Sequence, residues 1–152
     1  MVVDCGYRWV EMIIKVALLN EDEPKKFETA YDGKELDLEF IDFHYVEKIL
    51  LQGTAERVRQ TVTFRGTLSS RVDQVCARCL ESSARDLSAP FDLSYDATNK
   101  ELIDTTDDLR DILILEHPER FLCKADCLGI CSYCGANLNR EKCRCEIISH
   151  KV

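Results

Sequence analysis

The sequence predicts an α+β fold that is mainly antiparallel β, a meander or partly closed barrel, with a helix and a C-terminal cysteine-rich zinc module. The first observation is a period-two alternation of apolar and polar residues in consecutive runs between positions 46 and 95. The second is one short helical pattern near positions 107–116. The third is the crowding of six of the nine cysteines between Cys123 and Cys145.

The chain of 152 residues suffices for one domain, or for a small domain plus a metal module. The polar stretch 96–106 is the best boundary. We therefore expect a β-rich domain over 1–106 that carries the first Cys-x2-Cys pair, and a helix with a zinc-ribbon-like module over 107–152, packed on the first domain. The net charge of −8 argues against coating nucleic acid by electrostatics alone. Residues 119–151 nevertheless carry +2, from six basic and four acidic side chains.

The N-terminal region contains one predicted strand. Positions 10–19 are apolar but are interrupted by Glu11 and Lys15, which favours a strand over a membrane span or a secretory core. Positions 20–44 are polar and acidic and alternate poorly, so we expect a short helix or loop there. We expect a cytoplasmic protein with no membrane partner. Cys5 has no partner at an informative spacing, and we interpret it as a plain thiol.

The predicted strands of the β-rich domain cover positions 46–56, 61–68, 72–75 and 87–95. A turn around Ser69 and Ser70 is expected between the second and the third. Pro90 has no backbone N–H to donate, which indicates an edge strand or a bulge. The pair Cys76 and Cys79 would then lie on the hairpin between two strands, which is a rigid place for metal ligands.

A helix is predicted directly before the cysteine-rich stretch. Asp107 or Asp108 can cap its start, and the apolar side chains of Leu109, Ile112 and Leu113 recur at helical spacing. Pro118 ends the helix, because its ring is incompatible with a helix interior.

The strongest motif is Cys131-x2-Cys134 followed by Gly135, which has the form of a zinc knuckle. Cys143-x-Cys145 offers a second pair after a short loop. Pairs at such short spacing close small loops at little entropic cost. We therefore expect these four thiolates to form one tetrahedral zinc site.

The remaining spaced cysteines would form another zinc site, from Cys76, Cys79, Cys123 and Cys127. The cofactor is therefore Zn²⁺, with one or two ions. A single ion would unite the two Cys-x2-Cys pairs, which are Cys76 with Cys79 and Cys131 with Cys134. Disulfides would require an oxidising compartment, and an iron–sulfur cluster is a further alternative.

No catalytic constellation is visible, and we expect a protein that is not an enzyme and has no small-molecule substrate. His44, His117 and His150 each lack a nucleophile or carboxylate at an informative spacing. A Gly-rich phosphate loop and a nucleophile elbow are both missing from the sequence. Zinc sites with four sulfur ligands have no open coordination position, so the metal is expected to be structural.

Two stretches resemble the YceD family, the large ribosomal RNA subunit accumulation proteins of bacteria and plastids. They are Cys76-Ala-Arg-Cys79-Leu-Glu at 75–82, and the helix, its proline and the cysteine motif with Gly-Ala-Asn-Leu-Asn at 107–146. Ser132 stands where the family's knuckle usually has proline. The resemblance implies a role in 23S rRNA accumulation and large-subunit assembly. The partners would be the large-subunit rRNA precursor or ribosomal assembly proteins.

The residues expected to contact RNA or a partner lie in the C-terminal module: Arg120, Lys124, Asn137, Asn139, Arg140, Lys142 and Arg144. The basic side chains could instead neutralise the metal sites, because a zinc ion with four thiolates is formally a −2 unit. The two asparagines could simply cap the turn between the cysteine pairs. Two alternatives remain open: a zinc-stabilised protein-interaction module with a non-ribosomal protein partner, and a redox switch that releases zinc.

Overall fold

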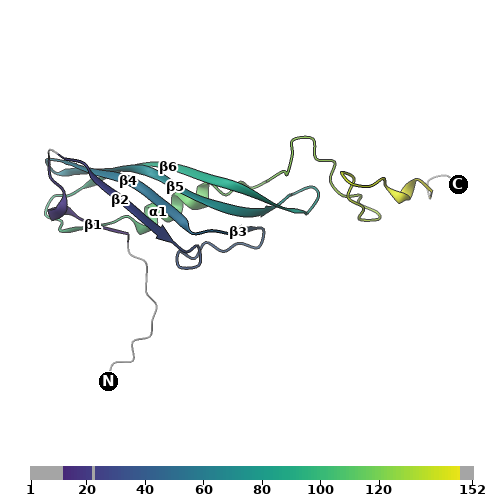
Figure 1. Cartoon of the computed structure of the whole chain (residues 1–152), viewed down its shortest axis with the longest axis horizontal. Helices are drawn as coiled ribbons and strands as arrows, with labels where there is room; N and C mark the ends of the chain where they lie inside the picture. Colours follow the sequence, from purple (N-terminus) through teal and green to yellow (C-terminus); the bar gives the residue numbers. More distant parts are fainter. Residues whose placement is uncertain (1–11, 22, 148–152) are drawn as a thin grey trace, which may run out of the picture.

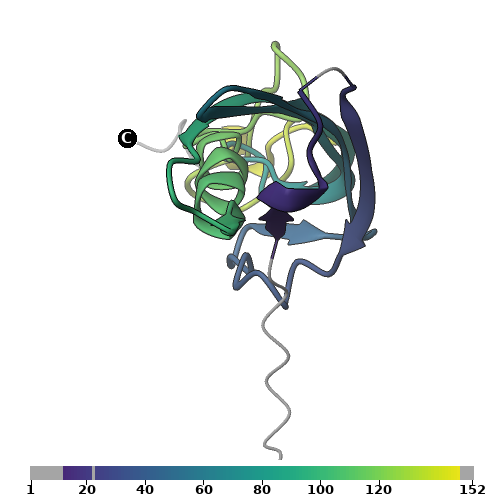
Figure 2. The same cartoon turned by 90° about the vertical axis from the view of Figure 1, so that its left-hand side faces the viewer.

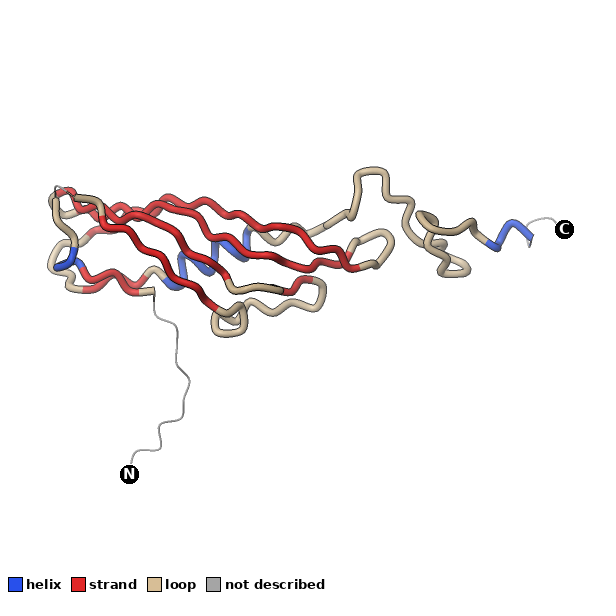
Figure 3. Tube along the Cα trace, in the orientation of Figure 1, coloured by secondary structure: helices blue, strands red, loops and turns tan. Residues whose placement is uncertain are grey.

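The computed structural model describes residues 12–21 and 23–147, so Cys5 and His150 lie outside the described part. Strands dominate it, as Figure 3 shows, together with one α-helix and two 3-10 helices. This confirms the mainly antiparallel β fold with a helix and a C-terminal cysteine-rich module. In chain order the elements are β1 (Ile13–Lys15), η1 (Val16–Leu18), β2 (Lys25–Tyr31), β3 (Phe43–Tyr45), β4 (Ile49–Val58), β5 (Thr61–Val75), β6 (Ser82–Asp96), β7 (Leu102–Asp104), α1 (Thr106–Leu115) and η2 (Arg144–Ile147).

The main sheet is built around β5, which has neighbours on both sides. Residues 61–69 of β5 pair with β4, and residues 72–74 pair with β3. On the other side, β6 pairs with β5 along its whole length. The strand β2 extends the sheet beyond β4, and all of these pairings are antiparallel. A separate two-stranded sheet joins β1 to β7.

The main sheet curls around one hydrophobic core, and α1 and β1 lie across its open side (Figure 2). Alternate residues of β5, such as Phe64 and Leu68, are buried in this core. Leu109 and Leu113 of α1 are buried in the same core. The arrangement agrees with the predicted partly closed barrel. Within the described residues, no helix has the length and apolar character needed to cross a membrane.

The start of α1 is fixed by β1 rather than by the predicted aspartates. Thr105 is the N-cap residue, and its hydroxyl donates to the carbonyl of Met12 at 2.8 Å. The hydroxyl of Thr106 accepts a hydrogen bond from the N–H of Met12 at 3.0 Å. Asp107 and Asp108 lie inside the first turn, where their negative charges interact favourably with the positive end of the helix dipole. Their assignment as caps was wrong, and the predicted end before Pro118 is confirmed.

Two other local predictions were wrong. Residues 25–31 form the strand β2 instead of a helix or loop, since backbone pairing with β4 outweighs their poor alternation. Ser69 and Ser70 lie inside the unbroken strand β5, where both pair with β6 and Ser69 also pairs with β4. The edge position of Pro90 is confirmed, because among the described strands β6 pairs with β5 alone.

Beyond α1 the chain leaves the barrel. Residues from about 119 onward run past the β5–β6 hairpin and contain little regular structure (Figure 1). Their described regular elements are the 3-10 helix η2 and an isolated bridge between Ile130 and Asn137. The division of the chain into domains at position 106 stays a prediction.

Candidate metal centres

The first cysteine pair lies in the tight turn that joins β5 to β6. The N–H of Cys76 donates to the carbonyl of Glu81 at 2.9 Å, and the N–H of Leu80 donates to the carbonyl of Cys76 at 2.9 Å. Leu80 closes the turn with a left-handed φ of 59°. Cys76 and Cys79 are both buried. The structure thus places this pair on a hairpin, as the strand pattern predicted.

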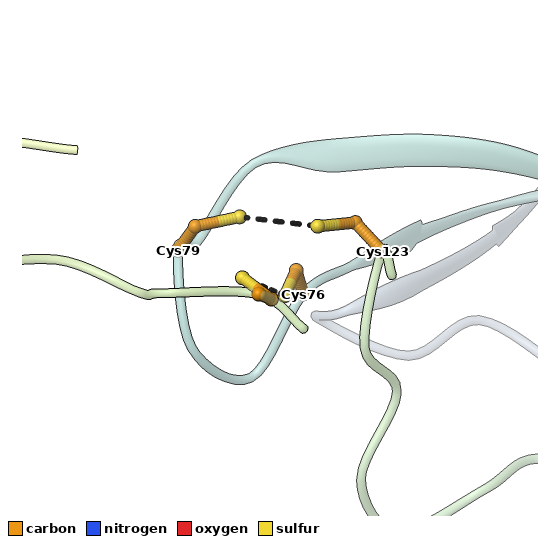
Figure 4. Close-up of side chains that lie close together, drawn as sticks. Cys76, Cys79 and Cys123 are labelled. Atoms are coloured by element: carbon orange, nitrogen blue, oxygen red, sulfur yellow. Dashed lines mark hydrogen bonds between the residues drawn. The ribbon is translucent and has the colours of Figure 1, made fainter. Parts of the chain in front are cut away.

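The segment after α1 brings two further cysteines to this hairpin. The Nη1 of Arg78 donates to the carbonyl of Cys127 at 3.0 Å, which fixes the approach. The sulfur of Cys127 lies 3.8 Å from that of Cys76. The sulfur of Cys123 lies 3.7 Å from that of Cys79, as the dashed line between them marks in Figure 4. All four sulfur atoms of this first group lie within 4.8 Å of one another. The first group therefore joins the barrel hairpin to the C-terminal segment.

The second group consists of Cys131, Cys134, Cys143 and Cys145, whose sulfur atoms also lie within 4.8 Å of one another. The knuckle turn closes through Gly135, whose N–H donates to the carbonyl of Cys131 at 2.9 Å and whose φ is 73°. Glycine adopts this left-handed conformation without steric cost. The sulfur of Cys131 lies 3.8 Å from that of Cys145, and the sulfur of Cys134 lies 3.8 Å from that of Cys143.

The spacing of the sulfur atoms fits a single tetrahedral ion in each group. Zinc–sulfur bonds of about 2.3 Å place the four sulfur atoms about 3.8 Å apart. Four separations of 3.7–3.8 Å match this value, and the sulfur atoms of Cys131 and Cys143 in the second group lie closer, at 3.2 Å. A disulfide bond needs about 2.05 Å, and all eight cysteines of the described chain are free thiols. Two groups of four cysteines are therefore positioned to bind metal ions, and neither combines the two Cys-x2-Cys pairs.

Hydrogen bonds favour the thiolate form of two cysteines in each group: Cys76 and Cys127 in the first, and Cys131 and Cys134 in the second. The N–H groups of Cys134 and Tyr133 lower the pKa of the Cys131 thiol to about 6. Burial raises the pKa of the Cys76 thiol, but backbone N–H groups outweigh it and lower this pKa to about 6. Burial and the neighbouring thiols raise the pKa of Cys123 to about 12. Crowded sulfur atoms therefore cannot all ionise together unless a cation offsets their repulsion.

In the second group, neighbouring thiols likewise raise the pKa of the Cys145 thiol. Hydrogen bonds to the side chains of Cys143 and Cys134 raise it to about 12. The second group is also the more open one. Cys134 is exposed and its three partners are half-buried, whereas three of the four cysteines in the first group are buried. A metal ion in the second group would therefore be easier for solvent and chelators to reach.

The two predicted asparagine contacts are half-buried within the module. The N–H and the Nδ2 of Asn139 both donate to Oδ1 of Asn137, each at 3.0 Å. Asn139 also reaches the first group, because its Nδ2 donates to the sulfur of Cys127 at 3.4 Å. Sequence reasoning missed this supporting role, since a spacing pattern does not reveal which loop amide faces which sulfur.

The basic residues predicted as contacts are all exposed, but two of them have acidic partners. Nη2 of Arg140 lies 3.0 Å from Oε1 of Glu81 in the hairpin, and Nη2 of Arg144 lies 3.7 Å from Oε2 of Glu141. Ion pairs between such exposed side chains contribute little to stability. The other three basic residues make no ion pair within the described chain: Arg120, Lys124 and Lys142. Their role as partner contacts stays a prediction.

The described histidines do not join the cysteine groups. The ring of His117 stacks on Phe40 with a centroid distance of 4.8 Å, and it packs edge-on against Phe43. His44 is an exposed residue of β3. The expectation that the protein is not an enzyme stays a prediction.

Comparison with known proteins gives two kinds of relative. The chain is 29% identical over 149 residues to uncharacterized proteins of Mycobacterium tuberculosis and Mycobacterium bovis, which covers 86% of this chain and 72% of each relative. It is 44% identical over 43 residues to the chloroplastic large ribosomal RNA subunit accumulation protein YCED homolog 1 of Arabidopsis thaliana. That match covers 28% of this chain and 13% of the plant protein. No family model and no solved structure matches the chain.

Proposed function

We propose that this chain is a YceD-like, non-enzymatic ribosome-biogenesis factor that supports 23S rRNA accumulation and large-subunit assembly in the cytoplasm. The observation that carries the proposal is the pair of four-cysteine groups, in a chain that matches a large ribosomal RNA subunit accumulation protein over 43 residues. The partners would be the large-subunit rRNA precursor or ribosomal assembly proteins.

Each cysteine group would hold one Zn²⁺ with a structural role. Four thiolates complete a tetrahedral shell and leave no position for a substrate or a reactive water. Because a cluster of several irons separates its cysteine sulfurs more widely than one ion does, spacings of 3.2–3.8 Å favour a single zinc. The first ion would lock residues 123–127 to the β5–β6 hairpin. The second would hold the loop that carries the exposed basic side chains in a fixed shape.

The decisive experiment is co-sedimentation of the full chain with large-subunit precursors at low and high salt. Association should weaken in a triple alanine variant of Arg140, Lys142 and Arg144. The slope of the logarithm of affinity against the logarithm of salt concentration should fall by about one unit for each phosphate left without its basic partner. The matched control replaces three exposed lysines of the barrel side: Lys26, Lys48 and Lys100. Equal association of both variants and the unaltered chain at every salt concentration would reject an RNA-facing module.

A second candidate function is a zinc-stabilised protein-interaction module with a non-ribosomal protein partner. Two large apolar side chains next to the first group favour it: Leu80 is 61% exposed and Leu128 is 65% exposed. Exposed apolar residues gathered at one place mark protein contacts more often than isolated ones do. Crosslinking in cells separates the two functions, because this candidate predicts a crosslinked protein that stays bound after ribonuclease treatment and is absent from large-subunit precursors.

A further inference from the structure

The knuckle of the second group carries an aromatic ring that the described chain leaves uncovered. Tyr133 lies between Cys131 and Cys134 and is 89% exposed. The N–H of Gly135 donates to the carbonyl of Cys131 at 2.9 Å, so the backbone beneath the ring is held in the closed turn of the knuckle. A tyrosine has only two side-chain torsions to order when it binds a partner. The ring is therefore a preformed flat surface for another flat group.

Two cations lie around the same cysteine group as this ring. Lys142 and Arg144 flank Cys143, whose sulfur lies 3.8 Å from that of Cys134, the residue after Tyr133. The N–H of Cys145, the residue after Arg144, donates to the sulfur of Cys143 at 3.3 Å. Both cationic side chains are exposed. The ion pair between Arg144 and Glu141 is 3.7 Å long and exposed, so it is weak enough for Arg144 to bind a phosphate instead.

We propose that an unpaired base of single-stranded RNA stacks on Tyr133 while the adjoining phosphates contact Lys142 and Arg144. The inference rests on the proposed function, because the RNA would be a segment of the large-subunit rRNA precursor. Duplex RNA does not fit, since its base faces are already stacked inside the helix. A protein partner fits less well, because Leu80 and Leu128 flank cysteines of the first group, and Ile130, beside this knuckle, is only 38% exposed.

The binding test compares the full chain and its variants on a single-stranded RNA of about ten nucleotides and on an RNA duplex. Tyr133→Ala should weaken single-strand binding by roughly 5- to 150-fold, which is the effect expected for one stacked base. The salt slope should not change, because the ring carries no charge. Replacing Lys142 and Arg144 by alanine should instead lower the slope by about 0.7 for each phosphate left without its basic partner. Tyr133→Phe and the matched control Leu115→Ala, at an 83% exposed position at the end of α1, should bind as the unaltered chain does.

A fluorescence test reports stacking directly. Trp9 is the only tryptophan of the chain, so Trp9→Phe combined with Tyr133→Trp places the only indole on the knuckle. Its emission should be quenched by the single strand and not by the duplex, with two metal ions retained per chain. Quenching by both RNAs, or by neither, would overturn the stacking site.

The outcomes separate this inference from the proposed function. If the unaltered chain co-sediments with large-subunit precursors but Tyr133→Ala binds RNA equally well, the stacking site is wrong and the proposed function stands. If Tyr133→Ala loses a protein of the precursor and keeps RNA binding, the knuckle is a protein contact and the inference is overturned. If the unaltered chain neither binds RNA nor co-sediments, both fail.

Discussion

The side-chain amide of Asn139 donates a hydrogen bond to the sulfur of Cys127, with a nitrogen–sulfur distance of 3.4 Å. The carbonyl oxygen of the same amide accepts a hydrogen bond from the N–H of Leu128 at 2.9 Å. Burial raises the pKa of the Cys127 thiol, but the amide of Asn139 and the N–H of Gly129 outweigh it and lower this pKa. A residue in the loop between the cysteine pairs of the second group thus contacts a cysteine of the first group.

Asn139→Ala should weaken metal binding by the first group about 10- to 100-fold, the usual cost of removing an outer-shell hydrogen bond to a ligand. The measurement is competition with a chelator on the full chain. Asn20→Ala, at an exposed position before β2, is the matched control and should leave both affinities unchanged. Equal affinity of Asn139→Ala and the unaltered chain would show that the 3.4 Å contact contributes nothing to the site.

The grouping of the cysteines predicts two metal ions per chain, each released separately. Cys127→Ser should release the ion of the first group, and Cys145→Ser should release the ion of the second group. Elemental analysis of the purified chains should give two ions for the unaltered protein and one for each variant. One ion in the unaltered chain, absent from both variants, would refute two independent sites.

Chelation should loosen the C-terminal segment before the barrel. Binding of a structural zinc contributes on the order of 10 kcal/mol of apparent folding free energy per site. Residues 119–147 have little regular structure to replace it, whereas the barrel has its own hydrophobic core. Hydrogen exchange after chelation should therefore accelerate over 119–147 while the amides of β5 stay protected. Unchanged exchange in the segment would mean that packing alone holds it together.

The second cysteine group was predictable because short cysteine spacing is a local constraint. Cys131 and Cys134 form one turn, so their pairing needs no knowledge of the rest of the fold. Cys123 and Cys127 were assigned to the first group only because they were the spaced cysteines that remained. The contact that places Cys127 runs through Arg78 of a hairpin 49 positions earlier in the chain.

The strands were predictable where one face is buried and the other is exposed. Val62, Phe64 and Leu68 alternate with polar residues, and all three are buried. The strand β2 escaped recognition because most of its residues are exposed, so little alternation marks it. Ser70 suggested a turn by its residue type, but its hydroxyl donates to the carbonyl of Glu47 at 2.9 Å while the strand continues. Tertiary pairing overrides local composition in both cases.

Metal affinity should rise with pH across the neutral range. The pKa values of Cys123 and Cys145 are raised to about 12, so both thiols hold protons at neutral pH until a metal ion displaces them. Protons therefore compete with the metal, and the affinity should gain about tenfold per pH unit for each proton released. Chelator competition between about pH 6 and pH 8 measures this slope. An affinity that does not change with pH would mean that the ligands are already ionised.

Gly66→Ala should destabilise the barrel without removing metal. A Cβ at Gly66 would overlap the carbonyl oxygen of Gln52 and the Cα of Gly53 on the paired strand β4, and it would lie 2.9 Å from the ring of Phe91. Because two of these atoms belong to backbone, the strands must separate, at a cost of about 3 kcal/mol in the free energy of unfolding. Denaturant unfolding followed by far-UV circular dichroism measures this change.

Gly135→Ala is the matched control, because it strains the chain in the second group for a different reason. Apart from its chain neighbours, no atom of the described residues lies within 4 Å of a Cβ at Gly135, but its φ of 73° costs an alanine roughly 1–2 kcal/mol. That strain should appear as weaker metal binding by the second group, with barrel unfolding unchanged. The opposite result for Gly66→Ala, loss of metal with unchanged barrel stability, would contradict this prediction. It would mean that the close approach of β4 and β5 at Gly66 does not stabilise the barrel.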